Sequence, residues 1–301
     1  MTSNIQRARP LLGTVVEIIV AGTADRDGNA AVDAAFDVAA HVHRLMSFHE
    51  AGSDVSWVNR EAERHAVQVH RWTYDVLKTA LDLYRRSRGL FDIAIAPTLQ
   101  ALEALPKMAR DVASPATPHA GSAAIELLPD CRVRFHESGI MVDLGGIAKG
   151  FAVDRAVEAL KDQGVALGFV NAGGDIAVFG SEAYPIQIRD PREPWHTALQ
   201  IDLKDEAVAS SGPSFDPVVA SRPTRPAILD PFHRIPAHAI VGASVCAPSC
   251  MVADALTKIV MLSGERCGEL LRHYNASAMF VAAGGEIHMT KDWRRAVHLA
   301  A

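Results

Sequence analysis

The stretch VDLGGIAKGFAVDRAVEAL, residues 142–160, predicts a strand, a glycine turn and a helix in direct succession. The apolar residues 140–142 indicate the short strand, and the glycine pair at 145–146 indicates the turn. Apolar residues recur at helical spacing over 152–160, soon after Lys149. Glycines let backbone N–H groups approach a ligand, and the N-terminus of a helix favours an anion. The turn is therefore a candidate phosphate site with a lysine beside it.

This turn matches neither of the two standard nucleotide-binding loops. A P-loop needs Ser or Thr directly after its lysine, whereas Gly150 follows Lys149 here. The glycine spacing also differs from the G-x-G-x-x-G pattern of dinucleotide-binding domains. The residues of the turn therefore indicate an anion and leave its identity open.

The composition excludes several classes of protein. The chain has 301 residues, 49% of them apolar, which is enough for one large domain or two ordinary ones. Its formal net charge of −5, with acidic and basic residues interspersed, argues against a nucleic-acid-binding protein. No run of about 18 apolar residues occurs, so we expect no membrane-spanning helix.

The N-terminus and the cysteines bear on the cellular compartment. Residues 1–20 contain two arginines but no continuous apolar core and no small-residue cleavage site, so they predict a strand rather than a signal peptide. We therefore expect a cytoplasmic protein. The four cysteines give no disulfide framework in a chain of this length, and buried thiols are favoured over a metal pair at Cys246 and Cys250.

Helices and strands mix without a regular order along the chain. Amphipathic patterns predict helices over 30–46, 72–87 and 251–262. Short alternating runs after residue 124 predict antiparallel strands joined by turns. Because strict βαβ alternation is missing, the sequence predicts an α+β fold rather than a doubly wound parallel sheet.

Proline-rich segments punctuate this pattern. Residues 106–121 are rich in Ala, Pro, Ser and Thr, residues 211–226 hold four prolines, and both are predicted to be long loops. After the first loop the pattern changes to short alternating runs, and this change predicts a boundary between two lobes near residues 120–124. Residues 90–96 are predicted to be extended and to end at Pro97.

Two aspartates are candidates for chemistry. Asp175 follows two glycines between two predicted strands, where an ordinary hairpin turn also accounts for it. Asp254 interrupts an apolar helix, either as an early-helix residue satisfied by the helix dipole or as a metal ligand. Thr257 lies about one turn further on the same face, so both oxygens could reach one hard cation such as Mg²⁺. The 13 histidines form no HExxH motif, and we expect no zinc site.

Eight segments, taken in order, resemble the motifs of the ApbE family, flavin transferases that use FAD to attach FMN to other proteins. Residues 142–156 match the most specific of these motifs almost letter for letter. The segments are LLGTVVEI (11–18), SFHEAGSDVSWVNR (47–60), GLFDIAIAP (89–97), VDLGGIAKGFAVDRA (142–156), VNAGGDIAVFG (170–180), ASSG (209–212), ILDP (228–231) and APSCMVADALTK (247–258).

The resemblance implies a fold and a set of site residues. The fold would be the α+β architecture of that family, related to the T-fold, a single domain over 1–301 with FAD in a cleft between its two lobes. Six residues would contact FAD: Leu12, His49, Phe91, Asp92, Lys149 and Ile228. Four would hold Mg²⁺, through main-chain oxygen in the turn and through side chains of the helix: Gly146, Ala148, Asp254 and Thr257.

The implied reaction is phosphoryl transfer. The pyrophosphate of FAD is cut, FMN goes to a threonine or serine hydroxyl of an acceptor flavoprotein with an Asp-x-x-Thr/Ser-Gly-Ala pattern, and AMP leaves. Mg²⁺ and Lys149 would neutralise the charge that develops, and Asp175 would organise the turn beside it. Many relatives act outside the cytoplasm, so the resemblance also allows a periplasmic location.

The chain departs from the family pattern at three places. Ala227 stands where a histidine, a candidate base, usually precedes the ILDP segment, and Lys258 stands where a threonine often follows the aspartate by four residues. His49 and Glu50 replace a tyrosine and an arginine in the first loop. Two alternatives to an active transferase stay open. One is an FAD-binding relative with weak transfer or pyrophosphatase activity, and the other is a non-catalytic flavin-binding scaffold or carrier.

Overall fold

A computed structural model describes residues 3–107, 121–193, 195–212, 228–291, 293 and 297–299. Most of the two predicted loops, and Ala227 with them, lies outside these residues. The predicted lobe boundary near 120–124 stays a prediction. Within the described part of the chain, no helix is both long and apolar enough to cross a membrane.

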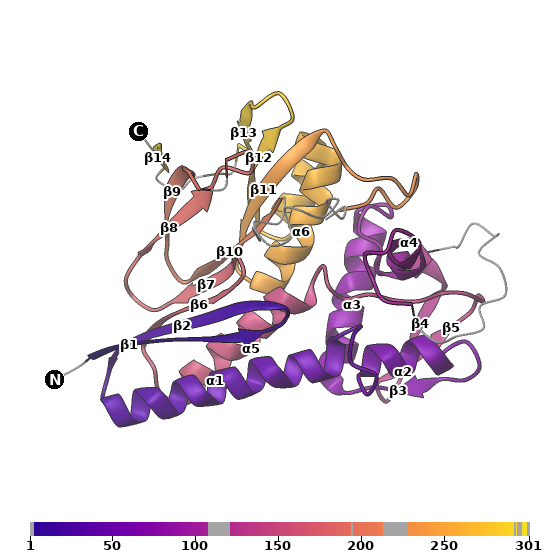
Figure 1. Ribbon diagram of the computed structural model, residues 1–301, viewed down its shortest axis with the longest axis horizontal. Coiled ribbons are helices and arrows are strands. Elements are labelled where there is room, and N and C mark those ends of the chain that lie inside the picture. The colour runs from indigo at the N-terminus through magenta and orange to yellow at the C-terminus, as the bar shows by residue number, and fades with distance from the viewer. Residues whose placement is uncertain are drawn as a thin grey trace.

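An antiparallel sheet of eight strands forms the centre of the fold (Figure 1). The strands in spatial order are β1 (Ser3–Leu11), β2 (Thr14–Thr23), β6 (Leu167–Ala172), β7 (Asp175–Phe179), β10 (Glu206–Ser211), β11 (Ile240–Ala247), β12 (Ser277–Ala282) and β13 (Ile287–Met289). Each neighbouring pair runs antiparallel. The predicted α+β class with antiparallel strands is therefore confirmed.

Two small sheets complete the strand inventory of the described residues. One has the order β14 (Val297–Leu299), β9 (Thr197–Leu203), β8 (Tyr184–Arg189), and the other β3 (Val67–Gln68), β5 (Arg132–Phe135), β4 (Ile125–Leu128). The helices are α1 (Asp25–Met46), α2 (Asp54–Glu61), α3 (Arg71–Arg86), α4 (Ala96–Ala101), α5 (Ala148–Asp162), α6 (Cys250–Ser263) and α7 (Gly268–His273). Three short 3₁₀ turns are η1 (Ile93–Ile95), η2 (Gly121–Ala124) and η3 (Gly264–Cys267).

The large sheet is covered on both faces, which is why strand β7 is buried at all of its positions. On one face, alternate residues of β2 (Val16, Ile18 and Val20) form a core with α1 and α5. On the other face, β6 and β7 share a core with β8 and β9. Figure 1 shows α1 running beneath the sheet, alongside α5, toward α2 and α3.

A third core joins α3 to α6. It includes Val76 and Leu77 of α3 and Leu256 and Ile259 of α6. Through Val133 it extends to the small sheet of β3, β5 and β4. The turn that precedes α5 lies in this core, because Leu144 and Ile147 are fully buried within it. The glycine turn is therefore anchored in the core that joins α3 to α6.

The predicted strand at 140–142 is wrong, since these residues belong to no strand or sheet. Instead, the side-chain amide of Asn59 pairs with Val142 as a neighbouring strand would. Its Nδ2 donates to the Val142 carbonyl at 2.9 Å, and its Oδ1 accepts from the Val142 N–H at 2.7 Å. Buried backbone groups need such partners, and here a side chain supplies them.

The prediction that an extended segment ends at Pro97 is also wrong. Residues 93–95 form η1, and Pro97 lies in the first turn of α4. A proline fits there because the first helical N–H groups have no partner within the helix and the ring fixes a helical φ. Proline interrupts a helix at interior positions, but here it lies in the first turn of one.

Candidate functional site

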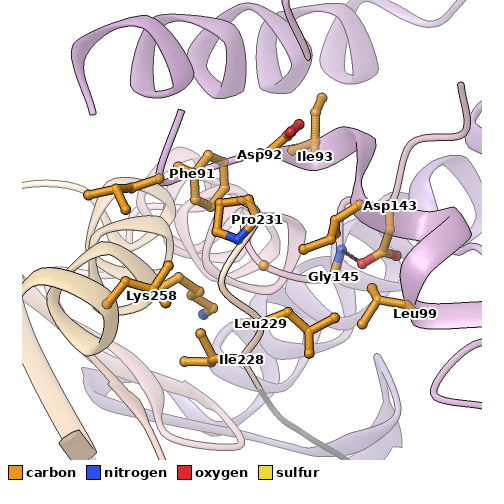
Figure 2. Close-up of a pocket in the computed structure, with 14 residues that line it drawn as sticks. Phe91, Asp92, Ile93, Leu99, Asp143, Gly145, Ile228, Leu229, Pro231 and Lys258 are labelled. Atoms are coloured by element: carbon orange, nitrogen blue, oxygen red, sulfur yellow. Dashed lines mark hydrogen bonds between the residues drawn. The ribbon is translucent and has the colours of Figure 1, made fainter. Parts of the chain in front are cut away.

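A pocket opens beside the glycine turn (Figure 2). Its wall is mostly apolar, and Asp92, Asp143, Lys258 and the two turn glycines supply the polar part. The lining residues are Leu90, Phe91, Asp92, Ile93, Ile95, Leu99, Asp143, Gly145, Gly146, Ile228, Leu229, Pro231, Lys258 and Leu262. The pocket therefore brings together segments that are far apart in sequence, around η1, the turn, the ILDP segment and α6.

Four of the predicted site residues line this pocket: Phe91, Asp92, Gly146 and Ile228. The others lie elsewhere. His49 is exposed, and Leu12, which adopts a left-handed φ of 57° between β1 and β2, packs against two of the cores. Which of these residues contact a flavin stays a prediction.

The Asp92 carboxylate organises the η1 side of the pocket. Its Oδ1 accepts from the Ala94 N–H at 2.8 Å and from the Ser122 hydroxyl and N–H at 2.5 and 3.1 Å. Ser122 in turn accepts from the Ile93 N–H at 3.1 Å. Asp92 thus caps the short turn that presents Phe91 to the pocket.

Asp143 ties the glycine turn to the same segment. Its N–H donates to the Ile93 carbonyl at 2.9 Å, and its carboxylate accepts from the Gly145 N–H at 3.2 Å. Burial raises the pKa of Asp143, although the Gly145 N–H and the nearby His49 act in the opposite direction. Asp143 therefore links the glycine turn to η1.

Four charged side chains form an alternating chain next to the turn. Lys149, from the first turn of α5, binds the carboxylate of Asp175 and lies 3.6 Å from Oδ2 of Asp254. Lys258 binds the other oxygen of Asp254. The two carboxylate side chains are 1% and 0% exposed, whereas Lys149 and Lys258 are 32% and 20% exposed. The acids are therefore inside, and the two ammonium groups lie closer to solvent.

Burial and the alternation of charge set the protonation of this cluster. Burial alone would raise the pKa of Asp254, but Lys149 and Lys258 hold it below its usual value. Burial and the negative charge of Asp254 raise the pKa of Asp175 to about 6, against the opposing effect of Lys149. Burial would lower the pKa of Lys149, but Asp254 and Asp175 outweigh burial and raise it. Lys149 consequently stays an ammonium group.

Asp175 fits both of its interpretations from the sequence. It is the first residue of β7, after a two-residue turn in which Gly173 and Gly174 have φ of 66° and 98°. The Asn171 side chain accepts from the Gly174 N–H at 2.9 Å and steadies that turn. Strands β6 and β7 therefore form a tight hairpin, which places the buried Asp175 carboxylate against Lys149.

The predicted Mg²⁺ ligands fit a divalent cation poorly. Thr257 is fully buried, and its hydroxyl donates to the Asp254 carbonyl at 2.7 Å. Its oxygen also lies 2.6 Å from the Ser211 hydroxyl, while Oδ2 of Asp254 accepts from the Gly150 N–H at 3.1 Å. Among the described residues, no three His, Cys, Asp or Glu side chains gather as a metal-binding group. Asp254 is a suitable ligand type, but Lys258 already binds it.

Asp154 has a structural role that the sequence patterns above do not predict. Its carboxylate accepts from the Ser249 hydroxyl at 2.7 Å and from the N–H groups of Cys250 and Met251 at 2.8 and 2.9 Å. It therefore caps the N-terminus of α6 from a neighbouring helix. The available signal was its spacing, because Asp154 lies four residues after Gly150 and so on the same face of α5.

Comparison with known proteins confirms the resemblance seen in the sequence. The model of the ApbE family matches residues 12–281. The FAD:protein FMN transferase of Treponema pallidum (strain Nichols) is 27% identical over 310 residues, covering 91% of this chain and 83% of that protein. The crystal structure of the ApbE protein from Thermotoga maritima has a TM-score of 0.83 and 26% identity, covering 97% of this chain and 98% of that one. The flavin transferase ApbE from Vibrio cholerae has the same fold, with a TM-score of 0.79 at 20% identity over 98% and 99% of the two chains.

Proposed function

The chain belongs to the ApbE family, and we propose that it is an FAD:protein FMN transferase. The observation that carries this proposal is the composition of the pocket. An apolar wall, with Phe91 and Leu262, meets a glycine turn and the ammonium group of Lys258. FAD has the complementary parts, an apolar ring system and an anionic pyrophosphate.

In the proposed reaction, a threonine or serine hydroxyl of an acceptor protein attacks the phosphorus of the FMN half of FAD. The P–O bond of the pyrophosphate breaks, AMP leaves with the bonding electrons, and the hydroxyl proton is released. Negative charge builds up on the departing phosphate, and fixed positive charge stabilises it best.

Lys149 and Lys258 supply fixed positive charge on this side of the turn. Asp175 and Asp254 hold Lys149 in place and keep it charged. Because the two carboxylates are buried and the two ammonium groups are partly exposed, an incoming phosphate would meet the positive ends of these ion pairs first. We include no Mg²⁺ in this scheme, since the donor set around Asp254 fits it poorly.

The direct test is incubation of the protein with FAD and a peptide that carries the Asp-x-x-Thr/Ser-Gly-Ala pattern. Mass spectrometry should show the peptide with FMN added, and the same peptide with alanine at the acceptor position should stay unmodified. The Vibrio cholerae flavin transferase serves as the positive control for the peptide.

The same reaction mixture separates the alternatives. Free FMN and AMP in equal amounts without modified peptide would favour a pyrophosphatase. FAD that binds and is recovered intact would favour a carrier. An unmodified peptide, under conditions in which the positive control modifies it, would refute the proposed function.

A further inference from the structure

We infer that the ammonium group of Lys258 serves as the cation of this site, so that the protein binds FAD without a divalent metal ion at Asp254. Lys258 binds two different oxygens of one residue. Its Nζ contacts the carboxylate of Asp254 and lies 2.9 Å from the main-chain carbonyl of Asp254. A hard metal ion seeks the same types of oxygen.

The position of the lysine on α6 makes this contact a specific one. Residues four apart lie one above the other on a helix, so Lys258 can fold back onto Asp254. A lysine at such a position usually extends into water, but this side chain is only 20% exposed. The side chain is therefore held at the site rather than in solvent.

Lys258 also faces the part of the pocket where an anion would lie. It lines the pocket together with Gly145 and Gly146, and a Cβ built on Gly146 would lie 3.6 Å from its Cε. Figure 2 shows Lys258 on the opposite side of the pocket from Gly145 and Asp143. The ammonium group thus stands between a buried carboxylate and the glycine turn.

The charge of the cluster argues against a further cation. Two carboxylates, Asp175 and Asp254, already face two ammonium groups, Lys149 and Lys258, and the formal charges balance. A divalent ion at Asp254 would add two positive charges beside Lys258 in a poorly screened environment. It would have to displace the lysine first.

The remaining oxygens near Asp254 are committed to hydrogen bonds. The single hydroxyl proton of Thr257 goes to the Asp254 carbonyl, so Ser211 must donate to Thr257 in their 2.6 Å contact. The Asp254 carbonyl accepts from Thr257 and also from Lys258. If a metal ion displaced the ammonium group, the carbonyl and the carboxylate of Asp254 would both lose their bond to Lys258.

The inference rests on the proposed function in one respect, namely that the pocket binds FAD. Calorimetric titration with Mg²⁺ alone tests it without FAD. The wild-type protein should show no saturable binding at millimolar Mg²⁺. Lys258→Thr should bind Mg²⁺ saturably, at least about tenfold more tightly than the detection limit set by the wild-type titration. Lys78→Thr is the matched control, because Lys78 is an exposed lysine in the middle of α3. It should behave like the wild type.

FAD affinity, measured by quenching of flavin fluorescence, gives the second readout. In the wild type it should be the same with Mg²⁺ and with EDTA. Lys258→Met, which keeps the length of the side chain without its charge, should bind FAD about tenfold or more weakly in EDTA. Circular dichroism verifies that each variant is folded.

Saturable, stoichiometric Mg²⁺ binding by the wild-type protein would overturn the inference, whatever the variants do. FAD affinity that falls when EDTA is added to the wild type would overturn it as well. If the protein fails to modify any peptide but shows no Mg²⁺ binding, the proposed function falls and the assignment of Lys258 stands.

Discussion

Gly150 lies where α5 contacts the start of α6, and Gly150→Ala tests whether this contact positions the site. A Cβ built on Gly150 would lie 2.3 Å from the carbonyl oxygen of Cys250, 2.6 Å from its carbonyl carbon and 2.8 Å from the Cα of Met251. These are main-chain atoms, which cannot rotate away as a flexible side chain can. Inserting a methyl group into such a contact costs up to about 3 kcal/mol. The higher helix propensity of alanine returns about 1 kcal/mol, so the net loss of stability should be about 2 kcal/mol.

The same displacement should weaken the site. The start of α6 is bonded to Asp154, and the Gly150 N–H donates to Asp254 at 3.1 Å. Moving α6 away from α5 lengthens both connections, so FAD affinity should fall together with stability. Urea unfolding, followed by circular dichroism, measures the first effect, and flavin fluorescence quenching measures the second.

The matched control is Gly268→Ala at the start of α7. Gly268 has helical dihedral angles, and a Cβ there would meet no atom within 4 Å. This substitution should leave stability unchanged or raise it by up to about 1 kcal/mol. A Gly150→Ala protein as stable as the wild type would refute the reasoning, and so would equal destabilisation by both substitutions.

Three further predictions concern single side chains. Asp154→Ala removes three hydrogen bonds at the start of α6 and should lower the free energy of unfolding, measured by urea titration, by about 2 kcal/mol. Asp154→Asn should lower the free energy of unfolding by less, because its side-chain oxygen can still accept some of these hydrogen bonds. Asn59→Ala leaves the Val142 main chain unpaired and should cost about 2 kcal/mol, with faster hydrogen exchange at the Val142 N–H; unchanged exchange would contradict this role. The Arg192 hydrogen bonds lower the pKa of Asp190 to about 2, below its unfolded value near 3.9, so the pair stabilises the fold at neutral pH and this stabilisation is lost as the pH falls. Asp190→Asn should therefore lower stability by less than about 1 kcal/mol at pH 7, and by less still near pH 3; a difference that grows on acidification would contradict the assignment.

The fold class could be predicted because it depends on local patterns. Helical spacing identified α1, α3 and α6 close to their observed bounds, and alternation identified the strands after residue 124. The two errors have a common cause. The run 140–142 has the apolar character of a strand, but its partner is the side chain of Asn59, 83 residues away. Pro97 lies in the first turn of α4 because of where the chain enters that helix, and a local pattern contains no information on either point.

The site could be predicted in part, and for a different reason. Motif order identified the family and singled out Lys149, Asp175 and Asp254, which the fold does bring together. The sequence could not show that Asp175 and Asp254 would face the same lysine, since β7 and α6 meet only in the folded chain. Asp154 escaped notice because its partners, at 249–251, lie in a different segment of the chain.

The alternating order of charges explains why this cluster is buried at all. Each carboxylate lies against at least one ammonium group, and Lys149 lies between both carboxylates. Removing Lys149 would leave the buried Asp175 carboxylate without the ammonium group that it binds, which typically costs about 3–5 kcal/mol, whereas the intact set is close to neutral. The fold therefore depends on the same cluster that supplies Lys258 to the pocket, and a chain with a lysine at position 258 balances the charge of its carboxylates with its own side chains. In such a site the positive charge is fixed by folding, while in a metal site it depends on the concentration of the ion.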